Sequence, residues 1–182
     1  GTLTQGNMAV RQLYLGTTLT SHAAVKAKPA LAGLYRPFFL TARMCHDLKE
    51  TEGHGTPAYL GDSMEAALVE MALHIDSGVP VYPKLDEIPF DTDRMRLSTL
   101  HRAPEGPALY CKGAPESVVP LCQHILIDGS VQSLGAEAKL RLVQAQDAMA
   151  QQGLRVLAFA YRNVAVGHDR ETLEQDLVFS GL

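Results

Sequence analysis

Three strand-like segments follow one another with only turns between them, and this arrangement limits the fold more than any other feature of the sequence. The segments are Leu85–Phe90, Met95–Arg102 and Ala108–Lys112. A turn, Ala103-Pro104-Glu105-Gly106-Pro107, separates the last two and is too short for the crossover that parallel strands need. We therefore expect antiparallel pairing across this turn.

Two strong helices are predicted on either side of these strands, over Asp62–Asp76 and Ala136–Gln152. Each repeats apolar residues at helical spacing, and each is followed closely by a glycine, Gly78 or Gly153, that suits a C-terminal cap. Helices interspersed with turn-linked strands indicate an α+β fold, in which helices flank an antiparallel β-sheet. A doubly wound parallel sheet is disfavoured, because helices do not join the strands of the central block.

The rest of the chain gives weaker signals. Ala30–Asp47 is predicted to be helical but either kinked or divided by Pro37, and Lys49–Leu60 is predicted to be a surface loop. The Asp128-Gly129 pair predicts a hairpin, and the alternation over Leu154–Arg162 predicts a strand.

Composition excludes several classes of function. The net charge of −4 provides no basic field for nucleic acid or an anionic membrane surface. No apolar run is long enough to cross a bilayer. The sequence also has no GxxxxGK[ST] loop, GxGxxG turn, GxSxG elbow or HExxH pair, so spacing alone suggests no enzyme.

Five short segments, taken together and in order, resemble the motifs of P-type cation-transporting ATPases. They match the end of the phosphorylation motif and four segments of the cytoplasmic nucleotide-binding (N) domain. The likeness is to the calcium-, sodium/potassium- and proton-pump group. The segments are Gly1–Thr4 (GTLT), Gly61–Leu68 (GDSMEAAL), Ile88–Ser98 (IPFDTDRMRLS), Tyr110–Glu116 (YCKGAPE) and Gly153–Ala158 (GLRVLA).

The resemblance implies a mechanism and a domain organisation. In the family, ATP, as Mg-ATP in the intact pump, binds between the N domain and a phosphorylation domain, and an aspartate becomes an aspartyl phosphate. That aspartate would lie three residues before Gly1, so the fragment is expected to hold nucleotide without turning it over. Residues 1–8 and 173–182 are expected to belong to the phosphorylation domain, and residues 9–172 to the N domain.

Further expectations follow from the family. The partners would be an adenine nucleotide and the phosphorylation and actuator domains of the parent chain, with no nucleic acid. The fragment would be a cytoplasmic part of an integral protein of the plasma or inner membrane, without touching the membrane itself. Overall likeness favours calcium as the transported ion.

Phe90, Lys112 and Gly113 are candidate ligand contacts. A lone Phe at a strand end is ordinarily a core residue, but the resemblance implies that Phe90 stacks on adenine. Lys112 is either a solvated strand-end lysine or a group near the base and phosphates. Gly113 is expected to let the ligand approach the backbone closely.

Glu65 and Arg155 complete the predicted site. Glu65 could form a capping box with Asp62, whereas the resemblance implies a hydrogen bond from the adenine amino group. Arg155 could lie over apolar neighbours at the surface, whereas the resemblance assigns it to the ATP phosphates.

Two positions depart from the family pattern. Thr92 and Met95 stand where related pumps often carry Arg and Lys, which removes positive charge near the phosphates. Arg94 or Arg96 could compensate for the lost charge, although strand alternation does not decide which face of the strand either side chain occupies. The alternative function is therefore a non-catalytic interaction domain that has kept the fold and lost the nucleotide.

Overall fold

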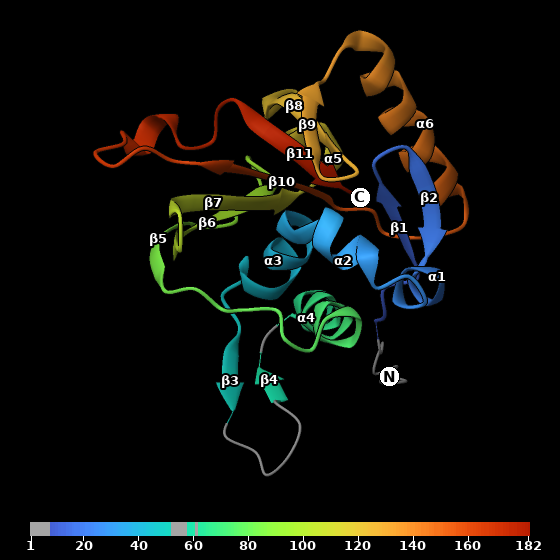
Figure 1. Cartoon of the computed structure of the whole chain (residues 1–182), viewed down its shortest axis with the longest axis horizontal. Coiled ribbons are helices and arrows are strands. Elements are labelled where there is room, and N and C mark those ends of the chain that lie inside the picture. The colour runs from blue at the N-terminus through green and yellow to red at the C-terminus, as the bar shows by residue number, and fades with distance from the viewer. Residues whose placement is uncertain (1–7, 52–57, 61) are drawn as a thin grey trace.

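A seven-stranded sheet forms the centre of the molecule, as the computed structural model shows for the residues it describes, 8–51, 58–60 and 62–182 (Figure 1). The strand order is β5-β6-β7-β10-β11-β8-β9, and all neighbours are antiparallel except β11 and β8. The predicted antiparallel pairing across the 103–107 turn is confirmed as β6 against β7. The strands are β5 (Lys84–Ile88), β6 (Arg96–Ala103), β7 (Gly106–Gly113), β8 (Cys122–Ile127), β9 (Ser130–Ser133), β10 (Ala158–Asn163) and β11 (Leu177–Gly181).

Two separate hairpins accompany the sheet. One pairs β1 (Gln12–Leu15) with β2 (Thr18–Ser21), and Tyr14 exchanges two backbone hydrogen bonds with Leu182 next to β11. The other pairs β3 (Lys49–Thr51) with β4 (Ala58–Leu60). The prediction of a surface loop over 49–60 was therefore wrong for residues 49–51 and 58–60, which pair as strands. These strands form through backbone hydrogen bonds, which a search for alternating side chains does not detect.

The helices agree closely with the sequence. The two strongly predicted ones are α4 (Ser63–Ile75) and α6 (Ala136–Gln151). The predicted division of the 30–47 stretch is confirmed: Tyr35 separates the two helices, and Pro37 lies in the first turn of the second. The remaining helical segments are α1 (His22–Lys26), α2 (Ala30–Leu34), α3 (Arg36–Met44), α5 (Pro115–Val118), η1 (Val119–Leu121) and η2 (Arg170–Thr172).

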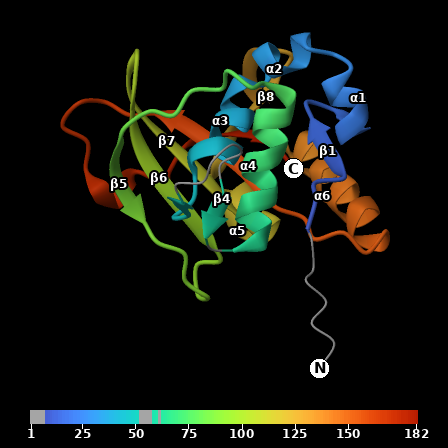
Figure 2. The same cartoon turned by 90° about the horizontal axis from the view of Figure 1, so that it is seen from below.

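Helices cover both faces of the sheet and make two cores. Along β7, Ala108 and Tyr110 face the core shared with α3 and α4, whereas Leu109 and Cys111 face the core shared with α5 and α6. This is the period-two alternation of a strand buried on both sides. Figures 1 and 2 show α3 packed on the sheet and α4 outside it, with α6 beside the β1–β2 hairpin. The α+β fold class is confirmed.

The return toward β10 differs from the prediction. The backbone becomes a strand only at Ala158, and Leu154–Leu157 form an irregular segment after α6. Segment 173–182 lies within the same sheet, since β11 runs between β10 and β8 and Leu177 is buried. The domain boundary after residue 172 stays a prediction about the parent protein.

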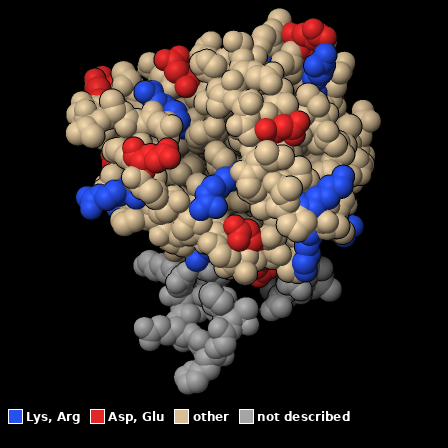
Figure 3. Space-filling view, viewed as in Figure 1, with Lys and Arg blue, Asp and Glu red and all other residues tan. Residues whose placement is uncertain are grey.

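The visible surface mixes charges of both signs. Figure 3 shows Lys and Arg side chains interspersed with Asp and Glu, without a field of one sign on that face. None of the helices in the described part of the chain is both long and apolar enough to span a bilayer. The motif at Gly1–Thr4 and residue Gly61 lie outside the described residues.

Candidate functional site

A cavity of about 520 Å³ brings together all five residues that the sequence singled out. Glu65 comes from the first turn of α4, Phe90 from the segment after β5, and Arg155 from the irregular segment before β10. Lys112 and Gly113 come from the end of β7. Four segments far apart in the chain thus meet at one hollow.

Glu65 and Lys112 form the floor of this cavity. The Lys112 ammonium donates a hydrogen bond of 2.9 Å to Glu65 Oε1, and both side chains are almost completely buried. Asp62 caps α4 by accepting from the Met64 backbone N–H at 2.7 Å, while Glu65 is directed at Lys112. The cap is therefore made by Asp62, and Glu65 belongs to the cavity.

The solvated interpretation of Lys112 was wrong. The residue is 6% exposed, because β7 is an interior strand and its neighbour β10 packs alongside. A buried ammonium needs a partner, and Glu65 supplies it. The ion pair uses one of the three ammonium protons, so a ligand acceptor in the cavity can use another.

Burial and charge act in opposite directions on Glu65. Burial raises the pKa of the Glu65 carboxyl, and the charge and hydrogen bond of Lys112 lower it in part. Asp47, another lining residue, raises the pKa further through its negative charge. The net pKa of Glu65 is above the ordinary value. The Glu65 carboxyl therefore takes up a proton more readily than an exposed glutamate does.

Phe90 stands on the open side of the cavity. The residue is 54% exposed, and β5 has already ended at Ile88. Phe90 is therefore not a core residue, and its aromatic side chain lines the cavity where a planar ligand could stack on it. This exposure matches what a stacking platform requires and what a core aromatic lacks.

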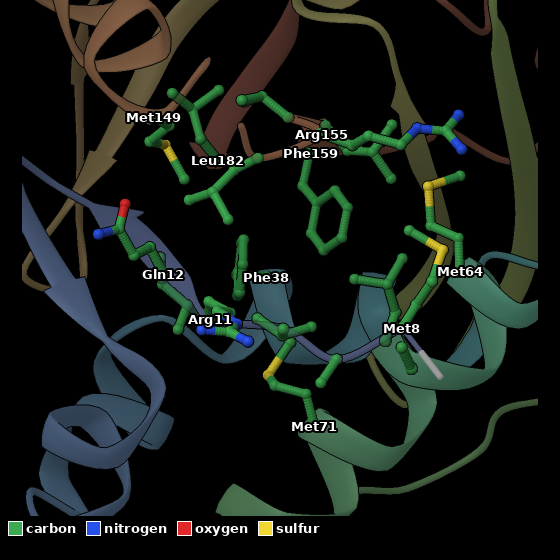
Figure 4. Close-up of a pocket in the computed structure, with 18 of the residues that line it drawn as sticks. Met8, Arg11, Gln12, Phe38, Met64, Met71, Met149, Arg155, Phe159 and Leu182 are labelled. Carbon is green, nitrogen blue, oxygen red and sulfur yellow. The ribbon is translucent and has the colours of Figure 1, made fainter. Parts of the chain in front are cut away.

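Arg155 is exposed and lies between two cavities. The second cavity, of about 370 Å³, is lined mainly by apolar groups that include Phe38, Met71 and Phe159. Figure 4 shows the Arg155 side chain leaving these apolar groups and carrying its guanidinium to the side where Met64 lies. Met64 and residues 155–157 line both cavities, so they form a shared wall.

Gly113 is required for a reason that the sequence did not predict. A Cβ at this position would lie 2.7 Å from Arg96 Cα and would also collide with the Met95 carbonyl oxygen. The close approach is therefore between two segments of the chain, where any side chain would push the backbone apart. Gly113 still lines the cavity, but nothing in its geometry demands a ligand.

The suggested compensation by Arg94 or Arg96 was wrong. Both guanidiniums pair with Glu174, and neither residue lines the cavity. Among the described lining residues, three are acidic (Asp47, Asp62, Glu65) and two are basic (Lys112, Arg155), which leaves one excess negative charge. Glu174 gave no sequence signal, because it lies 80 residues from Arg94.

Comparison with known proteins shows the family of this chain. Residues 35–182 match the family described as P-type ATPase, cytoplasmic domain N. Calcium-transporting ATPase 1 of Bacillus cereus is 30% identical over all of this chain and 20% of its own length, and calcium-transporting ATPase 1 of Lactococcus lactis is 32% identical over all of this chain and 21% of its own length. The cation-transporting ATPase pma1 of Synechocystis is 30% identical over all of this chain and 22% of its own length.

The chain spans about a fifth of the length of these relatives. The family match covers most of the chain, including the segments that contribute Glu65, Phe90, Lys112 and Arg155 to the cavity. The chain belongs to the P-type ATPase cytoplasmic N-domain family.

Proposed function

We propose that the larger cavity binds the adenine end of ATP. The observation that carries the proposal is the pairing of an exposed ring, Phe90, with a buried polar floor, Glu65 and Lys112, across one hollow. A planar base can stack on the ring while its edge meets the carboxyl and ammonium groups. The volume of about 520 Å³ lies in the range of small-molecule sites.

Charge favours the base over the phosphates. Lys112 is already paired with Glu65, and the lining has one excess negative charge, so Arg155 is the cation best placed for the phosphate tail. We expect binding between about 0.1 and 1 mM, or about −4 to −5.5 kcal/mol, with little difference between ATP and ADP.

In the parent pump, this domain would position Mg-ATP for phosphoryl transfer to an aspartate outside the chain. The phosphorylation and actuator domains would be its partners, with residues 1–8 and 173–182 leading into the phosphorylation domain. On its own, the chain would bind ATP without hydrolysing it. Acid-stable labelling of the isolated chain by γ-labelled ATP would contradict that part of the proposal.

Titration with ATP, ADP and adenosine, followed by calorimetry and by amide chemical shifts, tests the site. The expected result is a set of shifts that maps to residues around Phe90, Lys112 and Arg155. A Val166→Ala variant is the control, because Val166 is 91% exposed and is not among the described lining residues. Its titration should match that of the unmodified chain.

The second candidate function is an interaction domain that has kept the fold and lost the nucleotide. Thr92, Met95 and the excess negative charge of the lining favour it. Absence of both heat and shift changes at millimolar nucleotide would establish this alternative over the first.

We further propose calcium as the ion of the parent pump. Three relatives matched over the whole chain are named calcium-transporting. A shorter match is the magnesium-transporting ATPase, P-type 1 of Escherichia coli, 32% identical over 55% of this chain and 12% of its own length. The test is whether phosphoenzyme formation by the full-length pump, with Mg-ATP always present, depends on added calcium.

A further inference from the structure

The segment between β5 and β6 carries Phe90 at one end and Met95 at the other, and both residues line the cavity. A compact turn shapes it: Asp91 Oδ1 accepts from the backbone N–H groups of Asp93 at 2.9 Å and Arg94 at 2.7 Å. The Met95 N–H donates to the Asp91 carbonyl at 2.8 Å. These bonds tie Arg94 and Met95 to Asp91, the residue next to Phe90, so a contact that holds Arg94 also restrains Met95 and the backbone beside Phe90.

Glu174 holds this turn from the opposite end of the chain. Arg94 forks onto both carboxylate oxygens, through Nη1 to Oε1 and through Nη2 to Oε2 at 3.3 Å. Arg96 Nε donates to Oε2 at 3.1 Å, and Ser98 Oγ donates to the same oxygen at 2.6 Å. The Glu174 side chain is only 10% exposed, so this is a partly buried, charge-assisted cluster and not a surface ion pair.

The anchor is itself fixed. Arg162 on β10 donates through Nη1 to the carbonyl oxygens of Thr172 and Gln175, at 2.9 Å each. Leu173, beside Glu174, is 1% exposed. Glu174 is thus held by the sheet on both sides of its position, which lets it act as a fixed point for the turn.

Glu174 stays charged in the folded protein. Burial raises its pKa, but hydrogen bonds from Arg94 and Ser98 and the charges of Arg96 and Arg94 lower it by more. The net pKa is below the ordinary value, so Glu174 is a carboxylate at neutral pH and pairs with both guanidiniums.

We propose that Glu174 is a positioning residue of the nucleotide site. By clamping Arg94 and Arg96, it sets the place of the Phe90 ring and of Met95 at the cavity mouth. Packing alone holds Phe90 only weakly, because the residue is 54% exposed. The inference rests on the proposed adenine site and adds a residue to it that does not line the cavity.

Glu174→Ala and Glu174→Gln test the proposal, with Glu171→Gln as the matched control. Glu171 is an exposed acidic residue three positions earlier, so its variant changes the charge but not the clamp. The readouts are the Met95 methyl and Phe90 ring resonances without nucleotide, and the dissociation constants of ATP and adenosine. Thermal midpoints ensure that all titrations are made on folded protein, and Glu174→Gln, which keeps an acceptor oxygen, serves if Glu174→Ala does not fold.

The expected result is that Glu174→Ala shifts and broadens both resonances and weakens ATP and adenosine by the same factor, about tenfold. Glu171→Gln should change neither readout. Unmoved Met95 and Phe90 resonances would overturn the proposal, whether or not nucleotide binds. Tighter binding of ATP alone would also overturn it, since freed arginines would then matter more than the position of the ring. Failure of the unmodified chain to bind nucleotide is a distinct result that contradicts the adenine site.

Discussion

The floor and the mouth of the larger cavity, the proposed nucleotide site, are built by different means. At the floor, Glu65 and Lys112 are buried and paired, one on α4 and the other on an interior strand. At the mouth, Phe90, Met95 and Arg155 are exposed and lie outside helices and strands. The floor is part of what holds the fold together, whereas the mouth depends on the fold but adds little to it.

From this difference we expect that substitutions at the bottom and at the entrance of one cavity have different effects on stability and on binding. Changes at the floor should affect the free energy of unfolding first and binding second. Changes at the mouth should affect binding alone. The four predictions below test this separation.

Lys112→Ala is expected to have the largest effect. It leaves the Glu65 carboxyl buried without its partner, and breaking one side of a buried ion pair costs about 3–5 kcal/mol of unfolding free energy. Chemical denaturation measures the loss. The control is Lys84→Ala, because the Lys84–Glu87 pair is far more exposed, with side chains 40% and 30% accessible, and its loss should cost less than about 1 kcal/mol.

A double variant, Lys112→Met with Glu65→Leu, sharpens this test. Replacing both charges by apolar groups should restore most of the stability, since no charge is left unpaired. Nucleotide binding should remain lost, because the polar edge contacts are gone. A Lys112→Ala variant as stable as the unmodified chain would show that the floor does not differ from the mouth.

Acid should destabilise the floor through His46. Burial, and next the charge of Lys112, lower the pKa of His46 to about 4. Its Nδ1 accepts from the Leu48 N–H at 3.1 Å, which requires a neutral ring on that side. The unfolded chain takes up a proton near pH 6.5, so the stabilisation is complete above that pH and is lost as the pH falls toward 4, by at most about 3 kcal/mol.

Unfolding free energies at pH 7 and pH 4.5 measure this term as the difference between the unmodified chain and His46→Gln. Glu65 contributes with the opposite sign, because its raised pKa favours the folded state at lower pH, and the difference between variants removes that contribution. His168→Gln is the control, since His168 is exposed. An equal pH dependence in all three proteins would contradict the assignment.

At the mouth, Phe90→Ala should cost about 1–3 kcal/mol of nucleotide binding, the range for loss of a stacking ring. The melting temperature should hardly change, because Phe90 is 54% exposed and removal of its ring makes no sealed cavity. Phe90→Tyr should keep most of the binding. Phe159→Ala is the contrasting variant: Phe159 is buried, and its loss should cost about 3–5 kcal/mol of stability. Destabilisation of that size in Phe90→Ala would end the distinction between floor and mouth.

The sequence predicted local features well. The Asp128-Gly129 turn is confirmed with positive φ values of 48° and 82°, the backbone that such a pair favours. Asp62 caps α4, as expected for an aspartate directly before a helical apolar pattern. Such features depend on residues within a few positions of each other, where propensity and turn chemistry act directly.

Long-range pairings were not predictable in this way. Lys112 and Glu65 are 47 residues apart and Arg94 and Glu174 are 80 apart, so their contacts depend on how helices and strands pack. The family resemblance named the lining residues Glu65, Phe90, Lys112 and Arg155, but it could not show which cations were already paired. It also gave Gly113 a ligand-related reason, where the structure shows a contact between chain segments.

The smallest expected effects concern the charge of the mouth. Arg155→Gln should weaken ATP by about 0.2–1 kcal/mol, the range for exposed ion pairs, and leave adenosine unchanged. Met95→Lys should strengthen ATP by a similar amount, since the lining has an excess negative charge. Met95 has a φ of 57°, and Lys is also unbranched at Cβ, so the exchange adds no backbone strain.

Both effects should shrink in 0.5 M salt, whereas the Phe90 effect should persist. Arg102→Gln, at an exposed position that does not line the cavity, is the control, and an equal change in adenosine affinity would mean that Arg155 supports the shared wall and not the phosphates.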